Sequence, residues 1–128
     1  MRDELRPRVL IVEDEPLVLL ELEDTLTELG YRVVDSARDL VTGLILAAEL
    51  DFDVAVLDVN LAGLSSAKIA DLLRENGVPF LLITGYTAAG IPERLRSALR
   101  VPKPCESSTL SRALGDLLGD KSHRNTLS

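Results

Sequence analysis

The segment Val9-Leu10-Ile11-Val12-Glu13-Asp14-Glu15 indicates the fold class of the chain, because a continuous apolar run is followed at once by three acids. Four consecutive aliphatic residues without polar alternation predict a short strand that is buried on both faces. Such strands are typical of parallel sheets that carry helices on both sides. The acids then lie at the carboxyl end of the strand, which is the edge of an α/β sheet where ligands bind.

Two more apolar runs of the same kind end in polar residues. Val54-Ala55-Val56-Leu57 leads into Asp58, and Phe80-Leu81-Leu82-Ile83 leads into Thr84. A shorter run ends in Lys103-Pro104. Parallel strands present their carboxyl ends at one edge, so acids, a hydroxyl and a lysine are expected to converge there. Packed carboxylates repel one another unless a divalent cation compensates, which favours metal-assisted phosphoryl chemistry.

Strand and helix patterns alternate from one end of the chain to the other. Gly30 and Gly77 are expected to stop two helices, and Asp39 is expected to cap another. The pattern predicts strands at residues 8–12, 31–36, 54–57, 80–83 and 100–101, and helices at 15–29, 39–50, 65–76, 92–99 and 107–119. Five strands alternating with five helices predict a doubly wound α/β fold with a five-stranded parallel sheet and helices on both faces.

Length and composition predict one domain with an aliphatic core. The chain has 128 residues, of which 46% are hydrophobic and only 3% aromatic. We expect a single domain over residues 8–119, a flexible tail over 120–128 and no output domain. Cys105 is the one cysteine, which excludes an internal disulfide and fits a reducing compartment.

Charge and hydropathy bear on the partners of the chain. The net charge of −7 argues against nucleic-acid binding. The first residues alternate charges without an apolar signal core, and no apolar run approaches membrane-spanning length. The chain is therefore expected to be a soluble cytoplasmic protein with neither a nucleic acid nor a membrane as a partner.

The four polar clusters, in this order and spacing, resemble those of a CheY-like receiver domain, the response-regulator half of two-component signalling. The resemblance covers residues 8–119. It includes an acidic pair after the first strand, an Asp after the third, a Thr after the fourth and Lys-Pro after the fifth. The segments Leu57-Asp58-Val59-Asn60-Leu61, Val78-Pro79-Phe80 and Thr84-Gly85-Tyr86 are similar to those of stand-alone receivers common in alphaproteobacteria.

The resemblance implies a metal-dependent phosphoacceptor site. Asp58 is then the phosphoacceptor and a ligand of Mg²⁺ or Mn²⁺. Asp14 binds the metal directly, Glu13 binds it through water, and Asn60 contributes its backbone carbonyl. A phosphohistidine of a partner, or a small donor such as acetyl phosphate, supplies the phosphoryl group.

The resemblance also implies how the phosphoryl group is held and sensed. Lys103 pairs with one phosphoryl oxygen and Thr84 donates a hydrogen bond to another. Backbone N–H groups of Val59, Asn60 and Gly85 are further candidate donors. Tyr86 resembles the aromatic switch residue that turns inward once Thr84 moves, with a half-buried structural tyrosine as its alternative.

A receiver of this kind has a sensor histidine kinase or a phosphotransfer protein as one partner and an unidentified downstream protein as another. It catalyses its own phosphorylation and dephosphorylation without being a conventional enzyme. The chain is expected to be a monomer or a weak homodimer. A degenerate receiver that acts only as an interaction module, and a phosphate sink in a phosphorelay, remain alternative roles.

Each polar residue also has a purely structural interpretation. An Asp at a strand end is often a helix cap, and Glu15 is expected to be an acidic residue of a helix's first turn. A flavodoxin-like cofactor binder would need a phosphate-cradling loop where this chain has acids. A haloacid-dehalogenase-like phosphatase would need a second Asp where this chain has Pro16.

Three positions depart from the usual receiver pattern. Ala62 stands where Pro is frequent before a glycine, which here is Gly63. Gly85 stands where Ala is frequent, and Cys105 replaces a common aromatic. None of these changes removes a group that the phosphoryl chemistry needs.

Overall fold

A sheet of five parallel strands forms the centre of the molecule, in the order β2-β1-β3-β6-β7. The structure is a computed structural model that describes residues 6–85 and 90–127, with side chains up to residue 119. The strands are β1 (Arg8–Val12), β2 (Arg32–Ala37), β3 (Val54–Asp58), β6 (Phe80–Thr84) and β7 (Arg100–Pro102). This arrangement confirms the predicted doubly wound α/β fold.

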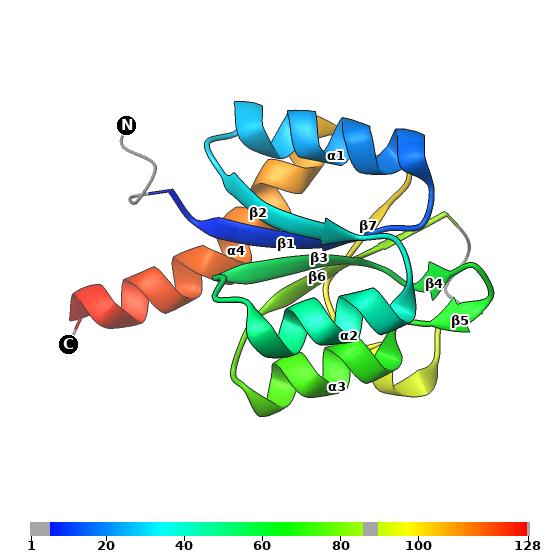
Figure 1. The fold of residues 1–128 in the computed structure, drawn as a ribbon. Coiled ribbons are helices and arrows are strands. Elements are labelled where there is room, and N and C mark those ends of the chain that lie inside the picture. Colours follow the sequence, from blue (N-terminus) through cyan, green and yellow to red (C-terminus); the bar gives the residue numbers. More distant parts are fainter. Residues whose placement is uncertain (1–5, 86–89, 128) are drawn as a thin grey trace.

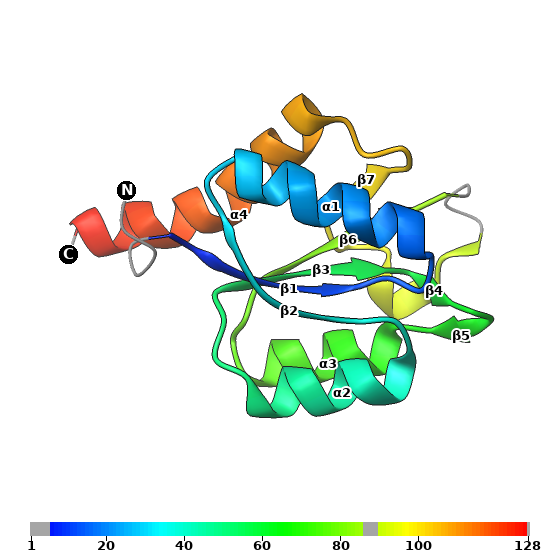
Figure 2. The ribbon, with the colours of Figure 1, turned by 45° about the horizontal axis from the view of Figure 1, so that its top comes forward.

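Helices cover both faces of this sheet (Figures 1 and 2). Helices α1 (Pro16–Glu28) and α4 (Ser107–Leu127) lie on one face, and α2 (Leu40–Glu49) and α3 (Ala67–Glu75) lie on the other. Each connection between parallel strands crosses over one face of the sheet. Because all five strands run in the same direction, their carboxyl ends meet at one edge.

The apolar runs are continuous because successive side chains enter two different cores. In β1, Val9 and Ile11 join the core under α1 and α4, while Leu10 and Val12 join the core over α2 and α3. All four are fully buried. Burying a side chain of this size stabilises the fold by about 1.5–3 kcal/mol, so a polar residue within such a run would be strongly unfavourable.

The boundaries of α1, α2 and α3 follow the predicted start and stop residues closely. Gly30 and Gly77 adopt positive φ angles of 98° and 69°, a conformation that glycine reaches without a steric penalty. The Asp39 carboxylate accepts a hydrogen bond of 2.8 Å from the backbone N–H of Thr42 and thereby caps α2.

Gly43 allows α2 to approach the sheet and α3 closely. A β-carbon at this position would lie 2.7 Å from Cδ1 of Ile69 and 3.1 Å from Cγ1 of Val12. Both distances are shorter than ordinary carbon–carbon contact. Since Val12 directly precedes Glu13, this close packing fixes the strand end from which the acidic residues project.

The expected helix over residues 92–99 is wrong in type and length. Within the described residues this segment has only the 3-10 helix η3 (Glu93–Leu95). Ile91 and Leu95 are buried and anchor the segment to the core, but two anchors do not make the apolar stripe that supports a longer α-helix. Arg96 Nε donates to the Ile91 carbonyl at 3.2 Å and stabilises the irregular backbone.

Two further elements differ from the sequence expectations. The loop after β3 contains a small hairpin of β4 (Asn60–Leu61) and β5 (Leu64–Ser65), with Ala62 and Gly63 at positive φ in its two-residue turn. Helix α4, expected to end at Gly119, continues to Leu127.

Within the described chain, no helix has both the length and the apolar character required to cross a bilayer.

Candidate functional site

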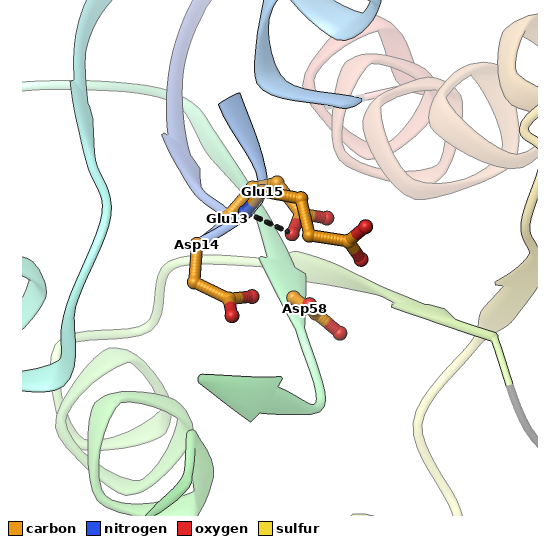
Figure 3. Close-up of side chains that lie close together, drawn as sticks. All are labelled: Glu13, Asp14, Glu15 and Asp58. Carbon is orange, nitrogen blue, oxygen red and sulfur yellow. Dashed lines mark hydrogen bonds between the residues drawn. The ribbon is translucent and has the colours of Figure 1, made fainter. Parts of the chain in front are cut away.

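Four carboxylates from two strand ends converge at the carboxyl edge of the sheet. Glu13, Asp14 and Glu15 follow β1, and Asp58 is the last residue of β3 (Figure 3). One ligand oxygen from each of the four lies within 4.8 Å of the others. Strands β1 and β3 are hydrogen-bonded neighbours, so their parallel pairing alone brings these residues together.

Burial makes two of these acids electrostatically unusual. Glu13 is completely buried and Asp58 is 5% exposed. Burial raises the pKa of Glu13 to about 7, against the lowering effect of nearby Lys103. Burial also raises the pKa of Asp58 above its ordinary value, with Lys103 again acting in the opposite direction. A buried carboxylate favours its charged form only where a cation or a hydrogen-bond donor is present.

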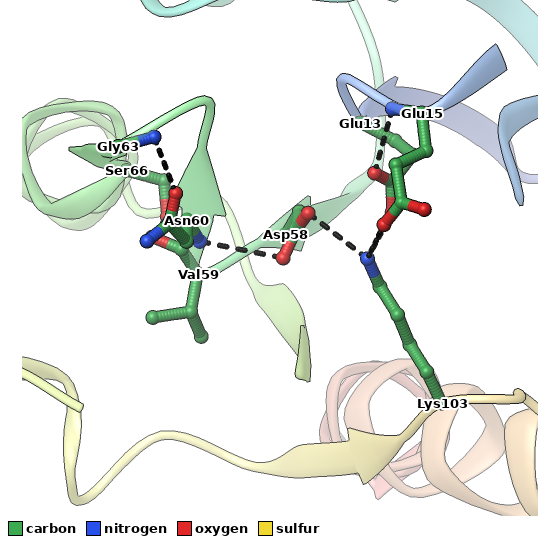
Figure 4. A network of polar contacts seen from close by, with 8 residues as sticks. All are labelled: Glu13, Glu15, Asp58, Val59, Asn60, Gly63, Ser66 and Lys103. Carbon is green, nitrogen blue, oxygen red and sulfur yellow. Dashed lines mark hydrogen bonds and ion pairs between the residues drawn. The ribbon is translucent and has the colours of Figure 1, made fainter. Parts of the chain in front are cut away.

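The positive charge in the described part of the site is the ammonium group of Lys103. Its Nζ lies 2.8 Å from Glu13 Oε1, 3.0 Å from Asp58 Oδ2 and 3.3 Å from Glu15 Oε1 (Figure 4). Burial lowers the pKa of Lys103, but its contacts with Glu13 and Asp58 outweigh burial and raise it above the ordinary value. Lys103 therefore carries its positive charge throughout the physiological pH range.

Backbone hydrogen bonds hold Lys103 and Asp58 in register. The N–H of Lys103 donates to the Thr84 carbonyl at 2.9 Å, which continues the pairing of β7 with β6. The N–H of Asn60 donates to Asp58 Oδ1 at 3.3 Å. The Asn60 side chain points away from the acids and accepts a 2.7 Å hydrogen bond from Gly63 (Figure 4).

The expectation that the backbone N–H of Val59 is directed at the phosphoryl site is wrong. The backbone N–H of Val59 is bonded to the Ile83 carbonyl at 3.1 Å, because the ladder between β3 and β6 continues past Asp58. It is therefore engaged within the sheet rather than directed at the acids. Asn60 and Gly85 both line the cavity at the site.

An open cavity of about 430 Å³ lies beside the acids. Its lining includes Asp14, Asp58, Asn60, Thr84 and Lys103. Glu13 lies close to Asp14 and Asp58 but beneath the surface of the cavity, because it is fully buried. The cavity thus places acids, a hydroxyl-bearing residue and a cation around one space, as expected from the strand ends.

Tyr86, the expected switch residue, lies outside the described residues.

The donor set is suited to a hard divalent cation. Its oxygens come from carboxylates, which suit Mg²⁺ and Mn²⁺. Oε1 of Glu13 is fully buried and accepts no well-directed hydrogen bond from the described residues, although the Lys103 ammonium lies close to it. Four clustered carboxylates face one ammonium, so the site retains negative charge that a cation would neutralise.

Glu15 belongs to the site, which the sequence analysis did not anticipate. It is the N-cap residue of α1 rather than a residue of the first turn, and its carboxylate contacts Lys103. The run of three consecutive acids was the available signal. Spacing alone could not show which of the three would face the lysine.

Comparison with known proteins identifies the family. Residues 9–114 match the family model of the response regulator receiver domain. The chain belongs to this family.

The receiver domain is similar to several characterised proteins. It is 31% identical over 119 residues to the phyllosphere-induced regulator PhyR of Methylorubrum extorquens, which covers 90% of this chain and 45% of PhyR. It resembles the solution structure of SdrG from Sphingomonas melonis Fr1, at 33% identity and a TM-score of 0.80, over 92% of this chain and 99% of SdrG. The receiver domain of PhyR from Erythrobacter litoralis gives 30% identity and a TM-score of 0.74, over 88% and 90% of the two chains.

The curated relatives are mostly longer proteins. The chain spans about half of their length or less, with 45% of PhyR and 36% of the transcriptional activator IrlR of Burkholderia pseudomallei. The shared part is therefore the receiver domain, and the activities of the remaining parts of those proteins do not transfer with it.

Proposed function

We propose that this receiver domain accepts a phosphoryl group on Asp58 and signals through contacts with other proteins. The observation that carries the proposal is the contact of 3.0 Å between Lys103 Nζ and Asp58 Oδ2 beside the acidic cluster. A buried aspartate held against a lysine at the edge of an open cavity has both the nucleophile and the cation that phosphoryl transfer needs.

In the proposed reaction, a carboxylate oxygen of Asp58 attacks phosphorus and the bond from phosphorus to the donor's nitrogen or oxygen breaks. Lys103 neutralises charge on the transferring group, and the Thr84 hydroxyl donates a hydrogen bond to a phosphoryl oxygen once that oxygen is in place. Little covalent work is left to the protein, so positioning and charge neutralisation account for most of the rate enhancement.

Glu13, Asp14, Asp58 and the backbone carbonyl of Asn60 would hold a magnesium ion. The ion, when bound, supplies charge neutralisation at the phosphoryl oxygens. Because Glu13 is buried and Asp14 lines the cavity, Asp14 is the better placed of the two for direct contact with the ion. Glu13 then acts through water, or by holding Lys103 and the backbone of Glu15.

The phosphodonor is proposed to be a histidine kinase or a phosphotransfer protein, and the output is a protein contact. A double mutant of PhyR from Bartonella quintana, an anti-anti-sigma factor, resembles this chain at 25% identity and a TM-score of 0.80 over 93% of it. We propose by analogy that phosphorylation changes the affinity of this receiver for a regulatory protein. Drainage of phosphoryl groups from a relay is the alternative use of the same chemistry.

The proposed chemistry is tested by incubating the protein with acetyl phosphate and magnesium and measuring its intact mass. The proposal predicts one added phosphoryl group that is lost at alkaline pH, as acyl phosphates are. Omission of magnesium should prevent the addition. A protein that acts only as an interaction module would keep its original mass under both conditions.

A further inference from the structure

Three carboxylates surround the ammonium group of Lys103. Glu13, Asp58 and Glu15 approach its Nζ to 2.8, 3.0 and 3.3 Å. Glu15 and Asp58 accept hydrogen bonds from Nζ, whereas Glu13 Oε1 lies at ion-pair distance without a well-directed hydrogen bond. A lysine ammonium has only three N–H donors, so a phosphoryl oxygen that pairs with Lys103 enters a crowded shell of carboxylates and must weaken one of these contacts.

The three carboxylates differ in their freedom to move. Glu13 is fully buried, and its Oε2 also accepts the backbone N–H of Glu15 at 3.1 Å. Asp58 is buried and is itself the proposed acceptor. The Glu15 side chain is 61% exposed and can turn into water without leaving a buried charge behind. The contact between Glu15 and Lys103 is therefore the one that yields.

The Glu15 carboxylate has no helix-capping task in the described chain. Glu15 is the N-cap residue of α1, yet its side chain makes no capping hydrogen bond there. The bonds that Glu15 contributes to the helix start are backbone bonds, from its N–H to Glu13 and from Leu19 N–H to its carbonyl. Gln or Ala at this position would keep them, so either substitution of the carboxylate tests its charge with little effect on the fold.

Glu15 also lies at the boundary between two cavities. It lines the cavity that contains Asp58, and it lines a second cavity of about 330 Å³ between α1 and the segment Lys103–Cys105. An anion approaching Asp58 from the open side therefore passes close to the Glu15 charge.

We infer that Glu15 is a positioning residue that competes with the phosphoryl group for Lys103 and opposes the approach of anionic phosphodonors. This inference rests on the proposed function. In the resting state Glu15 holds the lysine, and on phosphorylation it releases the lysine to the phosphoryl oxygen. The receiver thereby favours a donor that neutralises Glu15 with its own cationic group over a free acyl phosphate.

The test compares Glu15→Gln with wild type and with Asp24→Asn, which removes an exposed charge from the same helix about two and a half turns further on. Phosphorylation rates are measured with acetyl phosphate, a dianion near neutral pH, and with phosphoramidate, a monoanion. Glu15→Gln should be phosphorylated about two- to fivefold faster by acetyl phosphate, the range expected for one ion pair with an exposed partner. The gain should be smaller with phosphoramidate and should shrink with added salt.

A binding measurement provides a readout that does not depend on turnover. Glu15→Gln should bind beryllofluoride, a phosphoryl mimic, about two- to fivefold more tightly, because the mimic no longer competes with the Glu15 carboxylate for Lys103. Glu15→Ala should behave like Glu15→Gln, and Asp24→Asn should behave like wild type in every assay.

Three results would overturn the role of Glu15 while leaving the proposed function intact. They are Asp58-dependent phosphorylation at equal rates in wild type and Glu15→Gln, equal gains with the two donors, and an equal gain in Asp24→Asn. Absence of phosphorylation in every protein, wild type included, would instead contradict the proposed function and the inference with it.

Discussion

The ammonium nitrogen of Lys103 lies 3.0 Å from Oδ2 of Asp58, although the two residues are 45 positions apart in the chain. Asp58 ends β3 and Lys103 directly follows β7, with β6 between these strands in the sheet. The lysine side chain, the 3.0 Å contact and the aspartate side chain therefore together span two strand spacings, about 10 Å in all, across the end of β6. Thr84 at that end lies between the anion and the cation in sheet order.

Magnesium should stabilise the folded protein through Asp14. The clustered carboxylates repel one another, and an ion that binds only the folded state raises stability by mass action. At a concentration 100 times Kd the gain is about 2.7 kcal/mol. Thermal unfolding with and without magnesium should show this gain in wild type and its loss in Asp14→Ala.

Asp116→Ala is the matched control for that experiment, since Asp116 is an exposed acid on α4. It should respond to magnesium as wild type does. The Asp14→Ala protein without metal should be at least as stable as wild type, because one repelling charge has been removed. An equal magnesium response in all three proteins would exclude Asp14 as a ligand.

Thr84 should couple the phosphoryl group to β7 and the segment before it. Its backbone carbonyl already accepts the N–H of Lys103. Thr84→Ala removes a hydrogen bond to a charged group, which contributes about 1.5–3 kcal/mol, so beryllofluoride should bind at least about tenfold more weakly. Hydrogen exchange of residues 90–102 at saturating beryllofluoride should change in wild type and Thr84→Ser but remain unchanged in Thr84→Ala. A full response in Thr84→Ala would show that the signal leaves the site by another route.

The sequence predicted the strands and the residues at their ends because both depend on short local patterns. Four-residue apolar runs must be buried on both faces, and parallel pairing then brings Asp58 and the acids after β1 together. Segments without such a pattern were predicted poorly. Residues 92–99 have charges at mixed spacings, and η3 takes its shape from two buried anchors and from hydrogen bonds of arginines to backbone carbonyls.

The contact of Glu15 with Lys103 was beyond sequence reasoning for a different physical reason. Glu15 and Lys103 are 88 positions apart, and their contact depends on the direction in which the chain turns from β1 into α1. A one-residue change in that turn would direct another acid at the lysine. Spacing fixes which strand end a residue belongs to, whereas side-chain direction within a turn depends on the three-dimensional packing.

Gly43→Ala should destabilise the fold, although alanine normally favours a helix. The added methyl group would overlap Ile69 and crowd Val12, and overpacking of this kind costs about 1–3 kcal/mol. The helix propensity of alanine is about 1 kcal/mol more favourable than that of glycine and offsets part of this cost. A net loss of folding stability is therefore expected. Chemical denaturation should measure it.

Gly115→Ala makes the same exchange on α4, where an added β-carbon has no neighbour within 4 Å. This variant should be more stable than wild type by about 0.5–1 kcal/mol. If both variants shift in the same direction, the close approach of α2 to the sheet is not what requires glycine at position 43.

Cys105 should react slowly with alkylating reagents. Burial raises the pKa of its thiol to about 11, and the nearby Lys103 lowers it only in part. The thiolate is the reactive form, so the rate of iodoacetamide labelling should rise about tenfold for each pH unit between 7 and 10. At pH 8 the folded protein should react about tenfold more slowly than the same protein in urea, since the higher intrinsic nucleophilicity of a basic thiolate offsets part of its scarcity. Equal rates in the folded and unfolded protein would show that the thiol is exposed and unperturbed.

Asp58 is the proposed phosphoacceptor, and the decisive measurement maps the position of the phosphoryl group after reaction with acetyl phosphate and magnesium. Borohydride reduction converts an aspartyl phosphate to homoserine, which peptide mass spectrometry locates. We expect one modified residue in wild type, at position 58, and no stoichiometric phosphoryl group in Asp58→Asn, whose fold should be unchanged. An unmodified wild type, a phosphoryl group on another residue, or an unchanged rate in Asp58→Asn would contradict this assignment.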